Sequence, residues 1–268
     1  MTSRPIRHER GVFASLSDGV LGPVVDLSDL QLELHPPARI ELARRVWAER
    51  VRTELRSVQI MNRFLGEVIA AGDPIEVYAG AADLVVDELR HVRLTVALCE
   101  ALGGTPVFPD PIELREPDVY TRAPAAERAL HTAIAMLCVS ETLSVAFIED
   151  LRARCGDPAV KRVLDATLDD EETHHAFGWS YVEKALTRFP ASTRDDWREL
   201  VRRTLDPHRR ATDPILARLD AAGTTLADLP EPELAAQHER LSLLREEAER
   251  RAIDETLAPR LRALDLLS

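Results

Sequence analysis

Two Gly-Asp-Pro tripeptides, at positions 72–74 and 156–158, divide stretches of sequence that favour helices. Glycine commonly ends a helix and proline commonly opens the next one, so each tripeptide predicts a tight turn between two antiparallel helices. Alanine, leucine, arginine and glutamate dominate the flanking segments, as is typical of helices. We therefore expect two helical hairpins, with helices over 38–71, 74–102, 125–155 and 158–188.

A proline-rich segment of 20 residues, TPVFPDPIELREPDVYTRAP, joins the two hairpins. Hairpins with tight turns, joined by one long crossover, predict an all-α fold, namely a ferritin-like four-helix bundle. We expect this bundle over residues 37–190, an irregular N-terminal arm at 1–36 and a helical extension at 191–268. The extension packs on the bundle or forms a homodimer contact, and its helices are expected near 193–205, 213–222 and 231–265.

Composition limits the classes of partner. The chain is 45% hydrophobic, enough for a sizeable core, but only 4% aromatic, so the core is built from aliphatic residues. A formal net charge of -12 argues against binding to nucleic acid or to an anionic membrane surface, because both are negatively charged. The sequence contains no run of eighteen apolar residues, and its three cysteines lack the spacing of metal-ligand pairs. We expect a cytoplasmic protein with free thiols and no membrane span.

The pattern Asp-Glu-x-x-His occurs twice, at 87–91 and at 170–174. One such match is weak, but its position within the predicted hairpin adds information. Glu54 lies 18 residues before Gly72, and Glu88 lies 16 residues after it. At about 1.5 Å per residue, both glutamates are roughly 25 Å from the same turn. The first hairpin therefore brings one lone glutamate level with one Glu-x-x-His.

The second hairpin repeats this arrangement. Glu141 lies 15 residues before Gly156 and Glu171 lies 15 residues after it, which places both roughly 22 Å from their turn. In each of the four helices the acid interrupts a stripe of apolar residues at helical spacing, which indicates a face directed toward the core. Other glutamates, such as Glu49 and Glu67, fall on the opposite face, where we expect solvent.

Four carboxylates buried at one level need neutralisation. Each pair 4 Å apart repels by about 4 kcal/mol even at an effective dielectric constant of 20, so the carboxylates must bind protons or cations. Two divalent ions balance four carboxylates, and oxygen-rich ligands with one nitrogen per metal suit iron or manganese better than zinc. The candidate metal ligands, which are also the catalytic residues through the metals, are Glu54, Glu88, His91, Glu141, Glu171 and His174.

This ligand set resembles that of the non-haem di-iron carboxylate oxygenases and oxidases of the ferritin-like superfamily. The resemblance covers residues 38–188. It implies that the acid preceding each Glu-x-x-His, here Asp87 or Asp170, hydrogen-bonds a ligand histidine and so fixes the orientation of the imidazole.

The second motif can also be read in another register, with Glu172 and His175 as alternate ligands. In that register the glutamate lies one residue further from the turn at Gly156 than Glu141 does. His174 is therefore favoured as the ligand, and His175 is expected close behind the ligands or against a neighbouring helix.

The resemblance implies an enzyme that uses two iron ions to activate O₂ and oxidise a small-molecule substrate. Hydroxylation, N-oxygenation, desaturation and oxidative cleavage stay open, as does a biosynthetic tailoring step. Manganese or mixed manganese–iron would use the same ligand types, and an external electron donor or reductase is implied. The alternatives are a non-catalytic ferritin-like metal-binding or assembly protein, a manganese catalase and a tRNA hydroxylase, the last disfavoured by the net charge.

Overall fold

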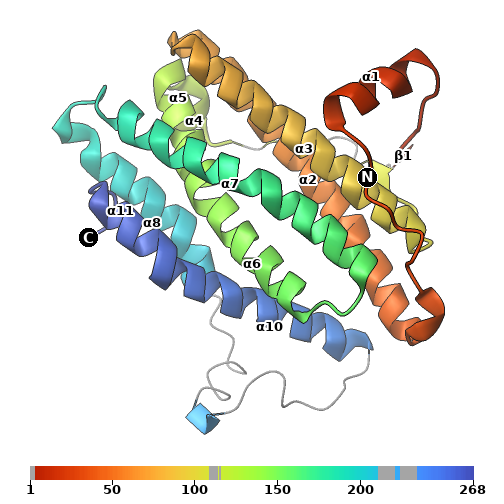
Figure 1. Cartoon of the computed structure of the whole chain (residues 1–268). Coiled ribbons are helices and arrows are strands. Elements are labelled where there is room, and N and C mark those ends of the chain that lie inside the picture. The colour runs from red at the N-terminus through yellow and green to blue at the C-terminus, as the bar shows by residue number, and fades with distance from the viewer. Residues whose placement is uncertain (1–3, 109–113, 115, 211–220, 224–233) are drawn as a thin grey trace. The chain divides into compact units, whose positions relative to one another are not determined.

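The computed structural model describes residues 4–108, 114, 116–210, 221–223 and 234–268. These residues form a helical bundle with one short two-stranded sheet, which confirms the predicted all-α fold class (Figure 1). The chain divides into two compact units. Unit 1 comprises Met1–Ala129 and Cys155–Asp170, and unit 2 comprises Leu130–Arg154 and Glu171–Ser268.

Unit 1 is built on a hairpin of two long helices, α2 (Pro37–Ala71) and α3 (Ile75–Ala101) (Figure 1). Pro37 occupies the first turn of α2, where its missing N–H costs nothing. At the other end Gly72 adopts a left-handed conformation with φ of 71°, and the N–H groups of Gly72 and Asp73 donate to the carbonyls of Ile69 and Val68. The first predicted tripeptide therefore forms the expected tight turn.

The N-terminal arm and the crossover contain short regular elements. Strand β1 (Arg4–Pro5) pairs antiparallel with β2 (Val107–Phe108). The arm, predicted to be irregular, also contains helix α1 (Val12–Leu21) and the single turn η1 (Leu32–Leu34), and the crossover contains α4 (Asp118–Arg122). Helix α1 lies beside α3. This tertiary contact could not be predicted from the local sequence of α1, which contains glycine and serine.

The first half of helix α7 (Pro158–Leu186) belongs to unit 1. Its start is capped by Asp157, whose carboxylate accepts hydrogen bonds from the backbone N–H groups of Ala159 and Val160. Val163 of α7 is buried together with three leucines, two of them in α3 and one at the residue that caps the C-terminal end of α3. Partly buried residues of the arm and of α2 pack against this cluster. The leucines are Leu94, Leu98 and Leu102.

Unit 2 contains the end of α5 (Ala125–Thr132), the π-helical segment η2 (Ala133–Ser140), α6 (Glu141–Arg154) and the second half of α7. After the turn η3 (Ala191–Thr193) follow α8 (Arg194–Arg210), α10 (Leu234–Ala252), the π-helical η5 (Ile253–Leu257) and α11 (Ala258–Ala263). Helix α10 packs against α6 within this unit. The helix predicted near 213–222 lies almost wholly outside the described residues.

One helical stretch among the described residues, Ala125–Arg154, is long and apolar enough to cross a membrane by length and composition alone. Its most apolar window is 56% buried. Leu130, Ile134 and Leu137 within it are fully enclosed, which is the pattern of a core helix in a soluble protein.

Candidate metal centre

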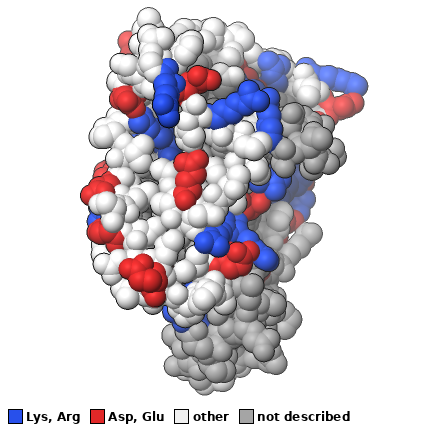
Figure 2. Space-filling model, turned by 90° about the vertical axis from the view of Figure 1, so that its right-hand side faces the viewer, with Lys and Arg blue, Asp and Glu red and all other residues white. Residues whose placement is uncertain are grey.

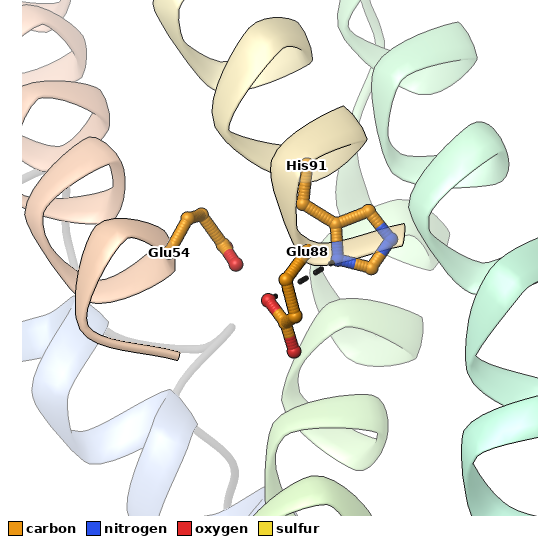
Figure 3. A group of neighbouring side chains, drawn as sticks. All are labelled: Glu54, Glu88 and His91. Carbon is orange, nitrogen blue, oxygen red and sulfur yellow. Dashed lines mark ion pairs between the residues drawn. The ribbon is translucent and has the colours of Figure 1, made fainter. Parts of the chain in front are cut away.

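Three of the predicted ligands come together in unit 1. Glu54 projects from α2 toward Glu88 of α3, and His91 lies one turn further along α3 (Figure 3). One ligand atom from each residue lies within 4.8 Å of the others. The side chains are almost fully buried, with exposed fractions of 5%, 2% and 1%. The tight turn brings Glu54 level with Glu88, and the i, i+3 spacing puts Glu88 and His91 on one helix face.

A hydrogen bond orients the ring of His91. Its Nε2 atom lies 3.2 Å from Oδ2 of Asp170, in the first half of α7. Because an ionised carboxylate only accepts hydrogen bonds, Nε2 carries the proton in this pair. The other ring nitrogen, Nδ1, lies 3.8 Å from Oε2 of Glu88, so it faces the proposed ligand group. This is the type of contact that the resemblance implied for Asp170.

Two arginines that the sequence reasoning missed support this group. Arg50 donates from Nε to Oε1 of Glu54 at 2.5 Å. Arg90 donates from one guanidinium nitrogen to Asp87 at 2.8 Å and to Asp170 at 2.5 Å. Arg90 thus ties together the two aspartates that precede the Glu-x-x-His motifs. The available signal was the i, i+4 spacing of Arg50 and Glu54 and the i, i+3 spacing of Asp87 and Arg90.

The electrostatics of this group favour positive charge. Burial by itself lowers the pKa of His91, but the hydrogen bond to Asp170 and the carboxylates of Glu88 and Glu54 outweigh burial and raise the pKa to about 10. Burial raises the pKa of Asp170, whereas the hydrogen bonds from His91 and Arg90 lower it below its ordinary value. A raised pKa means that His91 holds its second proton more tightly than a free imidazole does, so a metal ion binding at this ring competes with that proton.

A second group lies in unit 2. Glu141, Glu171 and His174 have exposed fractions of 4%, 4% and 0%. Nδ1 of His174 lies 3.4 Å from Oε2 of Glu171, and a carboxylate oxygen of Glu141 lies within 4.8 Å of a ring nitrogen of His174. Glu141 is the first residue of α6 and directly follows the π-helical segment η2. Such wider turns are rare and are often found at functional sites.

The alternate ligands lie outside this second group. Glu172 is exposed. His175 is half-buried, and its Nε2 lies 3.2 Å from both Oγ1 of Thr142 and a guanidinium nitrogen of Arg260. Burial and the charge of Arg260 lower the pKa of His175, so the neutral ring accepts the hydrogen bond from Arg260. The structure therefore groups Glu141 with the favoured register.

One expectation about the solvated face was wrong. Glu49 is exposed, as expected, but Glu67 is only 4% exposed. Its carboxylate accepts a hydrogen bond from the hydroxyl of Tyr120 in α4 and lies 3.6 Å from Nε of Arg128. The crossover covers the end of α2 at this point, and a burial created by a distant segment is invisible in the periodicity of α2.

The donor set of each group fits a hard or borderline divalent cation. Each offers two carboxylates and one imidazole, a combination suited to iron or manganese. Each also has two negative charges in a buried environment, where a cation relieves their repulsion. On the face shown in Figure 2, the described acidic and basic side chains are interspersed.

Comparison with known proteins leaves the site to be interpreted from its chemistry. No protein-family model matches the sequence, and no curated protein shows significant similarity to it. The chain is a helical bundle with buried clusters of acidic residues and histidines that are able to bind metal.

Proposed function

We propose that the two buried groups hold a pair of iron ions and that the protein is an O₂-activating oxidoreductase of the ferritin-like di-iron kind. The observation that carries this proposal is the group of Glu54, Glu88 and His91, with ligand atoms within 4.8 Å of one another and all three side chains buried. Ionised side chains are buried together where they are paired or coordinate a metal. Manganese or a mixed pair would use the same ligand types.

Chain connectivity supports pairing the two ions. Asp170 hydrogen-bonds His91, a proposed ligand of the first ion. The next residue of α7, Glu171, is a proposed ligand of the second ion. The equal spacing of Glu141 and Glu171 from Gly156 agrees with a second group at a single level of its hairpin.

The residues of the chain hold and orient the ions and keep water away. Asp170 accepts a hydrogen bond from the Nε2–H group of His91, which would leave Nδ1 to bind a metal ion. The bound iron pair supplies the redox chemistry with O₂ that side chains do not provide. We propose a small-molecule substrate and a hydroxylation, N-oxygenation, desaturation or oxidative cleavage. We also propose an external electron donor and a cytoplasmic location.

Metal content tests the ligand assignment. Elemental analysis of protein loaded anaerobically with ferrous iron should find two ions per chain. Glu54→Ala and Glu141→Ala should each lower this content. Glu49→Ala in α2 and Glu149→Ala in α6 remove exposed glutamates from the same two helices and serve as matched controls. Two retained ions in Glu54→Ala or Glu141→Ala would remove that residue from the ligand set.

Oxygen consumption tests the enzymatic proposal. The reduced, iron-loaded protein should consume O₂ and develop a transient visible absorption band. The oxidised ions should then be silent in electron paramagnetic resonance, because two adjacent ferric ions couple antiferromagnetically, whereas separate ferric ions give signals. Full iron loading without O₂ consumption would instead indicate a metal-binding or assembly protein. Decomposition of hydrogen peroxide by the manganese-loaded protein would indicate a catalase.

A further inference from the structure

A cavity of about 470 Å³ lies within unit 1, between the N-terminal arm and α3. Its apolar walls include Ile6, Phe13 and Leu21 of the arm and Leu89, Val92 and Val96 of α3. The volume falls in the range of small-molecule sites, roughly 300–1,000 Å³. This cavity is separate from the proposed ligands, since none of them lines it.

The walls expose apolar surface that a ligand would cover. Phe13 is 69% exposed and Leu89 is 39% exposed. Helix α1 has no buried residue at all. Solvent-exposed apolar side chains beside a cavity favour an apolar ligand. When such a ligand binds, water is released from the apolar surfaces of both the cavity and the ligand.

The charged groups around the cavity are largely engaged with one another. Arg93 forms an ion pair with Asp18 and donates to the carbonyl of Gly22 at 2.9 Å. Nε2 of His8 lies 2.8 Å from the carboxylate of Glu100. The remaining two charged residues of the wall, Arg7 and Glu9, have opposite signs. A charged ligand would have to compete with these pairs, whereas an uncharged one would not.

The arm is anchored, so the cavity walls are in place without a ligand. Arg90 of α3 donates from Nε to the carbonyl of Leu21 at 3.1 Å, next to the contact between Arg93 and Gly22. Helix α1 is bounded by Gly11 and Gly22, whose φ angles of 69° and 70° suit glycine and let the chain turn sharply at both ends. A wall fixed in this way lowers the ordering cost of binding.

We propose that this cavity binds an uncharged, largely hydrocarbon small molecule. The proposal is independent of the metal centre. The probe is the uncharged dye N-phenyl-1-naphthylamine, whose fluorescence rises in an apolar environment, titrated into the full-length protein as purified.

Two tryptophan variants of α1 provide the test. Ala14→Trp adds a bulky ring to a residue that lines the cavity, whereas Ser15→Trp adds the same ring at an exposed neighbour that does not. We expect Ala14→Trp to weaken dye binding at least about tenfold and Ser15→Trp to stay within about twofold of the parent. Equal affinities in all three proteins, or equal losses in both variants, would overturn the proposal, because the dye would then bind elsewhere.

Competition tests the charge of the ligand. 1-Decanol and decanoate carry chains of the same length, and the first is uncharged. We expect decanol to displace the dye at a concentration at least about tenfold lower than decanoate. Displacement by decanoate at the same or a lower concentration would contradict an uncharged ligand.

Discussion

The Nε2 atom of His91 lies 3.2 Å from Oδ2 of Asp170, although 79 positions separate the two residues in the chain. The contact joins α3 to α7 within unit 1 and fixes which ring nitrogen of His91 faces Glu88. The same aspartate accepts a hydrogen bond from Arg90, so its own position is also determined. Asp170 therefore orients the histidine of the first proposed metal group.

Asp170→Asn should weaken metal binding without unfolding the protein. The amide keeps the size of the side chain but loses the charge that holds the Nε2 proton of His91, and loss of such a partner typically costs 10–100-fold in metal affinity. Competition with a chelator of known affinity measures this change. Asp169→Asn, at the exposed neighbouring position, is the matched control. Equal affinities in the two variants would mean that Asp170 does not position a ligand.

Gly178→Ala should destabilise the protein. A Cβ atom at this position would lie 2.7 Å from Cβ of Leu137 and 3.2 Å from its carbonyl group, so α7 and η2 must move apart. Overpacking of this kind costs about 1–3 kcal/mol, which urea unfolding measures. Gly66→Ala is the control. Gly66 lies at an exposed position within the length of α2, and no other atom lies within 4 Å of the added Cβ. There we expect no loss, or a gain of up to about 1 kcal/mol. An equal shift in both variants would contradict the close contact.

The ends of the long helices could be predicted because they are determined locally. Glycine and proline at 72–74 set the conformation of the first turn, and the observed α2 and α3 begin and end within one residue of the expected positions. The i, i+3 pairing of Glu88 with His91 is local too. Together with the length of the hairpin, these two local features were sufficient to predict that Glu54 lies level with Glu88.

Features that depend on distant segments could not be predicted. Asp170 was expected to touch a histidine, but the identity of its partner, His91, depends on how α7 packs on α3. The π-helical turns before Glu141 shift the register of a helix that reads as regular from composition. The burial of Glu67 depends on Tyr120, which lies in the proline-rich crossover, far from Glu67 in the sequence.

Tyr120→Phe should destabilise unit 1. The hydroxyl of Tyr120 donates to the buried carboxylate of Glu67, and removal of a donor to a buried charge costs about 1–3 kcal/mol. Chemical unfolding followed by circular dichroism measures the loss. Tyr78→Phe, at a half-buried tyrosine of α3, controls for the removal of a hydroxyl. Losses of the same size in the two variants would show that the contact with Glu67 contributes nothing specific.

A buried carboxylate in unit 2 makes stability depend on pH. Glu249 of α10 is 6% exposed and accepts hydrogen bonds from Arg245 at 2.7 Å and, in α8, from His208 at 2.8 Å. Burial raises the pKa of Glu249, but the hydrogen bonds from His208 and Arg245 outweigh it and hold the pKa below the ordinary value of 4.5. The folded state therefore binds a proton at this carboxyl less readily than the unfolded state.

Glu249→Gln should lower the free energy of unfolding at neutral pH. The difference from the parent protein should disappear in acid. Because the folded pKa is depressed, the stabilisation is fully present above about pH 4.5 and is lost as the pH falls through the folded pKa. We expect urea unfolding to show a deficit of about 1–3 kcal/mol for the variant at pH 7, shrinking as the pH falls below 4.5. Glu255→Gln removes an exposed glutamate nearby in the chain and should show no comparable deficit. A deficit that stays constant down to the acid unfolding limit would mean that Glu249 contributes through packing and not through its charge.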